Sequence, residues 1–112
     1  MMPNENPLPQ CLRDVPPACA RLCLNVRRFL EERCGGRPGR IIAAFSGGAD
    51  STALALILRC LGLPVTLAHL DHGLRPESGE EAEAAREFAR RLGVPCVVRR
   101  VDVAGLARSE GL

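Results

Sequence analysis

The 112-residue sequence contains no lysine, tryptophan or tyrosine, and aromatic residues make up only 3% of it. A Walker A phosphate loop needs a Gly-Lys-Ser/Thr stretch, so the absence of lysine excludes that class of nucleotide site. The scarcity of aromatic residues removes the usual platforms for stacking single-stranded nucleic acid, and it predicts an aliphatic core. The formal net charge of +2 is too small to argue for or against a nucleic-acid partner.

Long apolar runs and paired cysteines are also missing. No segment approaches the roughly 18 consecutive apolar residues of a membrane-spanning helix, and residues 1–10 lack the basic start and apolar stretch of a signal peptide. The six cysteines show no Cys-x-x-Cys pair and no zinc-type spacing. We therefore expect a cytoplasmic protein whose reduced cysteines pack mostly as small hydrophobic side chains.

Hydrophobic residues make up 46% of the sequence, which is enough for the core of one domain or of part of one. Residues 1–38 are predicted to form a loose, Pro-rich leader over residues 1–15 and then a helix. Pro16-Pro17 opens this helix, and Gly35-Gly36 ends it.

Beyond residue 38, apolar runs are separated by turn signals. A short continuous apolar run typical of a strand covered on both faces lies at residues 41–45, and further strands are predicted at residues 65–70 and 94–101. Residues 52–61 are apolar nearly all round, which predicts a buried helix followed by Gly62. The next helix is predicted to begin at a capping box, Ser78-Gly79-Glu80-Glu81, and to end at Gly93. Its inward-facing residues are expected to be Ala85, Phe88, Ala89 and Leu92. On its surface, Glu87 can pair with Arg91. A further helix is expected after Asp102.

Strands that alternate with helices at this spacing predict right-handed crossovers. The predicted fold class is α/β, a parallel sheet with flanking helices in a Rossmann-like three-layer arrangement. Three strands make only a small sheet, so we expect it to be incomplete, with one unfinished edge. In such sheets ligands bind beyond the carboxyl ends of the strands, and site residues are therefore expected in the segments that follow them.

The SGGADS segment, residues 46–51, lies between the first predicted strand and the buried helix. Unpaired N–H groups at a helix start converge there, and the helix dipole adds positive potential. Gly47 and Gly48 allow positive φ and close approach of an anion, and the hydroxyls of Ser46 and Ser51 can donate to phosphate oxygens. The segment predicts a phosphate cradle built from backbone rather than lysine. A plain tight turn between strand and helix is the alternative.

Asp50 carries the acidic side chain of this segment. A carboxylate in the first turn of a helix stabilises the helix dipole, and that structural role is one interpretation. Beside a phosphate, however, the carboxylate would repel the ligand unless a cation lay between them. Mg²⁺ held by one carboxylate and by phosphate oxygens removes that conflict.

The segment resembles the PP-loop of the N-type ATP pyrophosphatases, whose pattern is S-G-G-x-D-S after a strand. The fixed positions of that pattern are matched by Ser46, Gly47, Gly48, Asp50 and Ser51. The resemblance implies an adenine nucleotide alpha hydrolase-like fold in which ATP is split into AMP and pyrophosphate, with this loop holding the pyrophosphate portion. Residues 39–112 would then be the N-terminal part of a PP-loop ATP-binding domain.

The second predicted strand runs into the sequence HLDHGLR, residues 69–75. Alternation along a strand points His69 and Asp71 to one face and His72 to the other, so a metal site would need the turn to bend them together. A plain polar turn with hydrogen-bonded histidines is a second interpretation. A role in the nucleotide site is the third, because this turn lies at the same sheet edge as the SGGADS segment.

This turn, the acidic helix after it and the sequence LGVPC resemble the corresponding stretches of tRNA(Ile)-lysidine synthases. The resemblance covers roughly residues 38–112 and implies a ligase that uses ATP, Mg²⁺, free lysine and isoleucine tRNA to convert the wobble cytidine to lysidine. It also implies roles for residues of this chain: phosphate binding by Ser46, Gly47, Gly48, Ala49 and Ser51, a catalytic magnesium-holding role for Asp50, adenosine contacts from His69 and Leu70 largely through backbone, and a phosphate or tRNA contact from Arg75.

The resemblance stops with the sequence. In lysidine synthases an S-x-E-x-x-A-R-x-x-R-Y-type helix and tRNA-binding domains would follow, so we expect a truncated N-terminal half that does not modify tRNA unaided. Two alternatives remain open. One is another PP-loop enzyme, a tRNA thiolase or an amidotransferase-linked synthetase. The other is a non-catalytic nucleotide-binding fragment.

Overall fold

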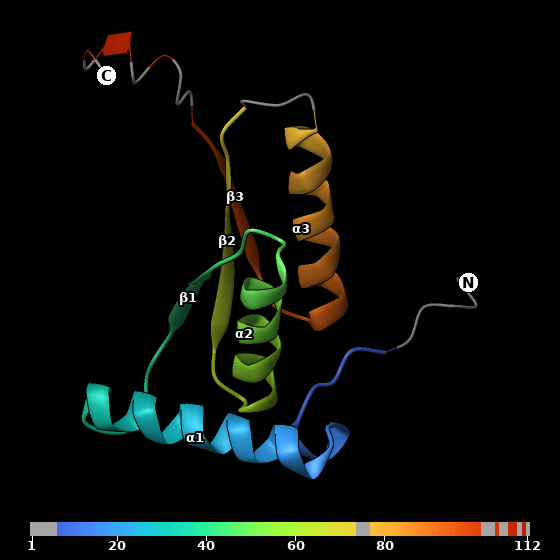
Figure 1. The fold of residues 1–112 in the computed structure, drawn as a ribbon, viewed down its shortest axis with the longest axis vertical. Coiled ribbons are helices and arrows are strands. Elements are labelled where there is room, and N and C mark those ends of the chain that lie inside the picture. Colours follow the sequence, from blue (N-terminus) through green and yellow to red (C-terminus); the bar gives the residue numbers. More distant parts are fainter. Residues whose placement is uncertain (1–6, 74–76, 102–104, 106–107, 110, 112) are drawn as a thin grey trace.

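The computed structural model of the chain describes residues 7–73, 77–101, 105, 108–109 and 111 (Figure 1). Its elements are a short 3-10 helix η1 (Leu12–Asp14), helix α1 (Pro17–Cys34), strand β1 (Ile41–Ala44), helix α2 (Ala49–Cys60), strand β2 (Val65–Asp71), helix α3 (Ser78–Leu92) and strand β3 (Cys96–Arg100). The predicted alternation of strand and helix is therefore confirmed. Arg75 and most of the helix expected after Asp102 lie outside the described residues.

The three strands form one parallel sheet in the order β1-β2-β3. Ile41 is paired with Val65, and Leu67 is paired with Cys96, so β2 lies between the other two strands. Parallel neighbours place the carboxyl ends of β1 and β2 at the same edge of the sheet, as expected. Residues 46–48 and 72–73, which follow these strands, therefore lie toward the same edge of the sheet.

Helices α2 and α3 pack on the same face of this sheet (Figure 1). Right-handed crossovers that advance in one direction across a sheet leave their helices on one side. The buried core lies between these layers and consists of Ala43, Phe45, Ala55, Leu58, Leu63, Val65, Leu67, Ala85, Ala89 and Leu92. The inward-facing residues predicted for α3 are all buried or partly buried in this core.

The opposite face of the sheet is open within the described part of the chain. Ile42 is 71% exposed, Leu70 51% and Val97 37%. The expectation that the first strand is covered on both faces is therefore wrong, because the described residues place α2 and α3 on one face of the sheet and leave Ile42 exposed on the other. Apolar runs predict a strand, but they do not reveal whether this stretch of chain supplies the helices for both sides.

The exposure of α2 corrects a second expectation. Ala55 and Leu58 are buried in the core against the sheet and Cys60 is buried as well, whereas Leu54 is 42% exposed. The helix is therefore apolar nearly all round but not buried all round within the described part of the chain. It also begins at Ala49, before the predicted start.

Some details predicted for α3 differ from the structure. The capping box is wrong, because Ser78 is already the first helical residue and Glu77 is the N-cap, without a side-chain cap hydrogen bond. Glu87 forms an ion pair with Arg90, which was not the predicted partner. The hydrogen bond from Arg90, followed by the nearby arginine charges, lowers the pKa of Glu87. Gly93 ends α3 in the left-handed conformation, as predicted.

The leader is partly packed rather than loose. Leu8 lies against the core, and Arg59 of α2 donates from Nε to Oε1 of Gln10 at 2.9 Å. Asp14 Oδ2 accepts from the backbone N–H of Gln10 at 2.8 Å, which closes the 3-10 turn. Within the described part of the chain, none of the helices combines the length and apolar character needed to cross a bilayer.

Candidate functional site

The SGGADS segment leaves the sheet from a firmly held residue. The N–H of Phe45 donates to the carbonyl of Ala68 at 2.8 Å, which extends the pairing of β1 with β2 by one residue. The Phe45 ring is buried and stacks on Phe88 of α3, with ring centroids 5.0 Å apart. The start of the segment is thus tied to both the central strand and a covering helix.

Inside the segment, serine hydroxyls already occupy the backbone donors. Ser51 Oγ accepts from the N–H groups of Ser46 and Gly47, each at 3.2 Å, and lies 3.1 Å from Ser46 Oγ. Ser46 Oγ in turn accepts from the N–H of Gly48 at 3.3 Å. The expectation of unpaired amides is therefore wrong for these three residues, because Ser51 reaches back to the amides of Ser46 and Gly47, and Ser46 bonds the amide of Gly48 two residues ahead.

These hydroxyl contacts nevertheless mark where donors converge. A hydroxyl oxygen has two lone pairs, yet Ser51 Oγ faces two amides and a second hydroxyl, and it also donates to the Gly48 carbonyl at 3.3 Å. All of these distances lie at the long end of the hydrogen-bond range. A phosphate oxygen makes shorter, charge-assisted bonds and can compete for the same donors.

The next two residues, in the first turn of α2, do carry unpaired N–H donors. The N-cap is Gly48, which has no side chain to cap the helix, and within the described residues the N–H groups of Ala49 and Asp50 have no hydrogen-bond partner. Both residues are exposed. A helix start of this kind is suited to an anion, because the amides point outward and the helix dipole favours negative charge.

The two glycines differ in conformation. Gly47 has φ 91°, in the region that L-residues rarely adopt, whereas Gly48 has φ −79°. A Cβ at Gly48 would lie 3.5 Å from Ser46 Oγ, an ordinary van der Waals contact. The positive φ that both glycines allow is therefore adopted at Gly47 and not at Gly48.

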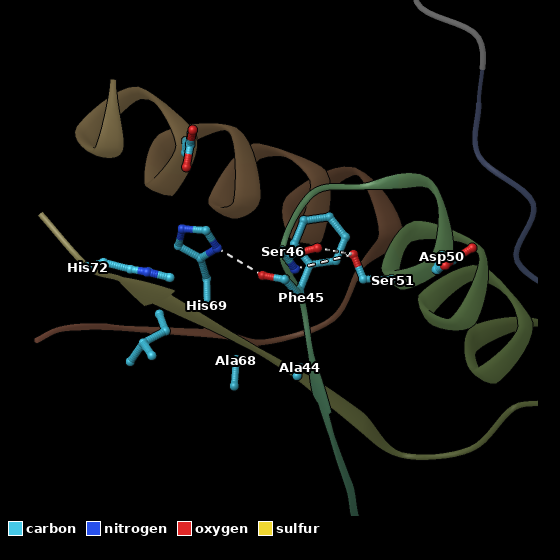
Figure 2. A pocket seen from close by; sticks show the side chains of 10 residues that line it. Ala44, Phe45, Ser46, Asp50, Ser51, Ala68, His69 and His72 are labelled. Carbon is cyan, nitrogen blue, oxygen red and sulfur yellow. Dashed lines mark hydrogen bonds between the residues drawn. The ribbon is translucent and has the colours of Figure 1, made fainter. Parts of the chain in front are cut away.

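Two cavities flank the segment at the carboxyl edge of the sheet. The first, shown in Figure 2, has a volume of about 500 Å³ and is lined by Ala44, Phe45, Ser46, Asp50, Ser51, Ala68, His69, Leu70, His72 and Glu81. The second, of about 480 Å³, lies between the segment and α3 and is lined by Phe45, Ser46, Gly47, Gly48, Thr52, Glu81, Ala84, Ala85 and Phe88. Both volumes are in the range of roughly 300–1,000 Å³ that is usual for small-molecule sites.

The structure brings most of the predicted site residues together around the first cavity. Ser46, Asp50 and Ser51 come from the SGGADS segment, and His69 and Leu70 come from the end of β2. Leu70 is half exposed on the open face, whereas His69 is buried with its Nδ1 2.8 Å from the Phe45 carbonyl oxygen. The His69 side chain is thus hydrogen-bonded, as the polar-turn interpretation of HLDHGLR expected, although the residue lies within β2 rather than in a turn.

No cluster of three or more potential metal ligands occurs among the described histidine, cysteine, aspartate and glutamate side chains. Asp71 Oδ1 instead accepts from the N–H of Gly73 at 3.0 Å and stabilises the turn. The exposed Asp50 carboxylate, beside the free donors of α2, suits Mg²⁺, which is commonly held by one or two carboxylates plus phosphate oxygens. The residues present therefore fit a metal bound together with a polyphosphate rather than by the protein alone.

Sequence analysis missed Phe45, Thr52 and Glu81 as residues that line these cavities. Thr52 and Phe45 directly flank the SGGADS segment, so their positions were a usable signal. Glu81 is distant in sequence and comes near only because the first turn of α3 faces the segment across the sheet edge. Its place depends on the packing of α3.

Fold and site together define an α/β protein with a glycine- and serine-containing turn at the carboxyl edge of a parallel sheet, beside two cavities. A family model described as the PP-loop domain matches residues 21–112, and the chain therefore belongs to the PP-loop domain family. That match includes the SGGADS segment and every described strand.

The chain is also similar to individual named proteins. The chain is 48% identical over 71 residues to tRNA(Ile)-lysidine synthase of Thermus thermophilus, a match that covers 63% of this chain and 14% of the relative. It is 45% identical over 92 residues to the protein of that name from Nitratidesulfovibrio vulgaris, covering 73% of this chain and 26% of the relative. For the Methylobacterium sp. protein of the same name, the identity is 52% over 63 residues, 54% of this chain and 18% of the relative. The chain thus spans less than a third of these relatives.

Proposed function

We propose that the chain is the ATP-binding part of a ligase of the tRNA(Ile)-lysidine synthase type. The observation that carries the proposal is the set of donors converging on the SGGADS segment beside a cavity of about 500 Å³ at the carboxyl edge of the sheet. Membership of the PP-loop family and similarity to the named synthases support ATP as the ligand.

In this proposal the polyphosphate of ATP lies against the SGGADS segment. The N–H groups of Ala49 and Asp50 donate to phosphate oxygens directly, whereas those of Ser46, Gly47 and Gly48 exchange their serine hydroxyl partners for phosphate. The Ser46 and Ser51 hydroxyls, released from one another, also donate to phosphate. The exposed Asp50 carboxylate holds Mg²⁺ together with phosphate oxygens.

The adenosine lies toward the end of β2 and contacts His69 and Leu70, largely through their backbone. The His69 ring is already bonded to Phe45, which agrees with a backbone rather than a side-chain contact. Arg75, proposed as a phosphate or tRNA contact, lies outside the described residues.

The proposed reaction proceeds in two steps. The carbonyl oxygen of the wobble cytosine attacks the α-phosphorus of ATP, forming an adenylated base and releasing pyrophosphate. The amine of free lysine then attacks the activated ring carbon, AMP leaves, and the amine loses a proton. Magnesium, when bound, would neutralise part of the negative charge on the departing pyrophosphate. The SGGADS segment binds that leaving group through its amides and hydroxyls.

Lysine and isoleucine tRNA are proposed as partners of the complete enzyme. The chain spans only a small share of its relatives, and its net charge of +2 offers little attraction for a tRNA backbone. We therefore expect the isolated chain to bind ATP without modifying tRNA. Release of AMP in the presence of lysine and isoleucine tRNA would show that it is active alone.

Titration calorimetry with ATP, with and without Mg²⁺, tests the proposal. Asp50→Asn is expected to weaken binding about tenfold or more in the presence of Mg²⁺ and far less in its absence. Glu83→Gln is the matched control, because it removes the same charge from the exposed face of α3 away from both cavities. Equal losses for Asp50→Asn with and without metal would refute the magnesium role, and no binding by the wild-type chain would refute the nucleotide site.

A further inference from the structure

His69 stands apart from every other polar side chain in the described part of the protein. It is the one polar residue classed as buried there, with 6% of its surface exposed. Figure 2 shows its ring between the sheet and α3, with Nδ1 directed at the carbonyl oxygen of Phe45, 2.8 Å away. A buried ring nitrogen and a buried carbonyl each carry a desolvation penalty if left unpaired, and this bond satisfies both.

The carbonyl that His69 holds belongs to the peptide that begins the SGGADS segment. In a trans peptide the carbonyl of Phe45 and the N–H of Ser46 lie in one plane and point in opposite directions. The oxygen end of this plane is bonded to the His69 ring, and the N–H end points at Ser51 Oγ, 3.2 Å away. Whatever fixes the carbonyl therefore also aims the first amide of the segment.

Strand β2 holds both backbone polar groups of Phe45. The N–H of Phe45 is held by the Ala68 carbonyl at 2.8 Å, so consecutive residues of β2 bind the two backbone polar groups of Phe45. Ala68 uses its backbone, which any residue provides, whereas His69 uses its side chain. Beyond Phe45 the regular pairing of β1 with β2 ends, so the side-chain bond replaces a sheet bond where the strand turns into the segment.

The bond also determines the tautomer of His69. A carbonyl oxygen can only accept a hydrogen bond, so Nδ1 must carry the hydrogen. In the neutral ring Nε2 is then unprotonated.

We propose that His69 is a positioning residue for the SGGADS segment. Through Nδ1–H it holds the Phe45–Ser46 peptide in the orientation that directs the Ser46 and Gly47 amides toward bound polyphosphate. This inference rests on the proposed nucleotide site and assigns the His69 side chain a task distinct from the proposed backbone contact with adenosine.

Three substitutions at position 69 separate this role from others. His69→Asn places an amide nitrogen where Nδ1 lies and can still donate to Phe45. His69→Gln carries its amide farther out, near the place of Nε2, and His69→Leu retains bulk without a donor. We expect the affinity for Mg²⁺-ATP, measured by calorimetry, to stay within about threefold of wild type for His69→Asn and to fall about tenfold for the other two.

Affinity alone does not separate positioning from global loosening, so hydrogen exchange at the Ser46 and Gly47 amides is measured without nucleotide. We expect faster exchange in His69→Gln and His69→Leu than in His69→Asn, while amides in the middle of α3 exchange as in wild type. Preserved affinity in His69→Gln together with loss in His69→Asn would overturn the proposal, because it would indicate a direct role for Nε2.

The wild-type chain offers a test that needs no substitution at position 69. Long-range nitrogen–proton NMR correlations identify the tautomer of each histidine, and with two histidines in the sequence a His72→Gln sample assigns them. We expect Nδ1–H for His69, and an Nε2–H ring would overturn the proposal. If the wild-type chain fails to bind ATP, the proposed function fails, while the tautomer and the exchange data still decide the role of His69.

Discussion

The ring of Phe45, the last residue before the SGGADS segment, stacks on the ring of Phe88 in α3 with an interplanar angle of 10°. Phe45 is 5% exposed, so this contact joins the buried end of β1 to the covering helix. It links the stability of the fold to the geometry of the site, because the segment begins at the next residue.

Phe88→Leu is expected to lower the free energy of unfolding by about 1–2 kcal/mol, since it removes the stacked ring and leaves the pocket incompletely filled. Urea unfolding monitored by circular dichroism measures the change. Phe29→Leu is the control, because the Phe29 ring is 54% exposed on α1, and a change within about 0.5 kcal/mol is expected there. Equal effects for the two variants would contradict the anchoring role of the stack.

Gly47 and Gly48 are expected to respond differently to alanine. Gly47→Ala forces a Cβ into left-handed backbone at φ 91° and should destabilise the chain by about 1–2 kcal/mol. Gly48→Ala has a compatible backbone and an ordinary contact, so stability should hold or rise by about 0.4–1 kcal/mol.

If polyphosphate approaches the backbone at Gly48, Gly48→Ala should still weaken the binding of Mg²⁺-ATP despite its intact fold. Calorimetry on the same samples used for urea unfolding makes the comparison. Unchanged affinity in Gly48→Ala would show that the ligand does not approach this residue closely.

The open face of the sheet predicts self-association of the isolated chain. Ile42 lies there with 71% of its surface exposed, so Ile42→Thr should change the free energy of unfolding by no more than about 0.5 kcal/mol. Leu67, fully buried on the covered face, should lose about 2–5 kcal/mol when replaced by alanine. Sedimentation velocity should show less association in Ile42→Thr than in wild type, and equal association would locate the contact elsewhere.

The cysteines should divide into fast and slow groups toward a thiol reagent. Cys19 and Cys34 are exposed, whereas burial raises the pKa of Cys23, Cys60 and Cys96. A raised pKa lowers the thiolate fraction at a given pH, so these three thiols should react more slowly than the exposed pair near pH 8. Mass spectrometry after timed alkylation reads out each site, and the difference should vanish in denaturant.

Helix α2 was predicted correctly in its type and nearly in its bounds, but not in its burial. Its apolar sequence predicted a helix at nearly the right residues, because local hydrophobic pattern and the terminal glycine are local signals. The same pattern predicted burial on every side, and this was wrong, because burial depends on which other elements pack nearby. Leu54 is 42% exposed although its type suits a core.

The site shows the same division. Sequence alone determined the strand–turn–helix context, the order of the residues in the SGGADS segment and the family to which they point, since these depend on neighbouring positions along the chain. Only the tertiary structure decided that serine hydroxyls cap the first amides, that Gly47 and not Gly48 needs a glycine, and that His69 holds the Phe45 carbonyl. The physical reason is that the sheet and helices place the two ends of a turn, and those ends set its hydrogen bonds and backbone angles. His69 is 24 residues from Phe45 in the sequence and reaches it only because β1 and β2 are paired.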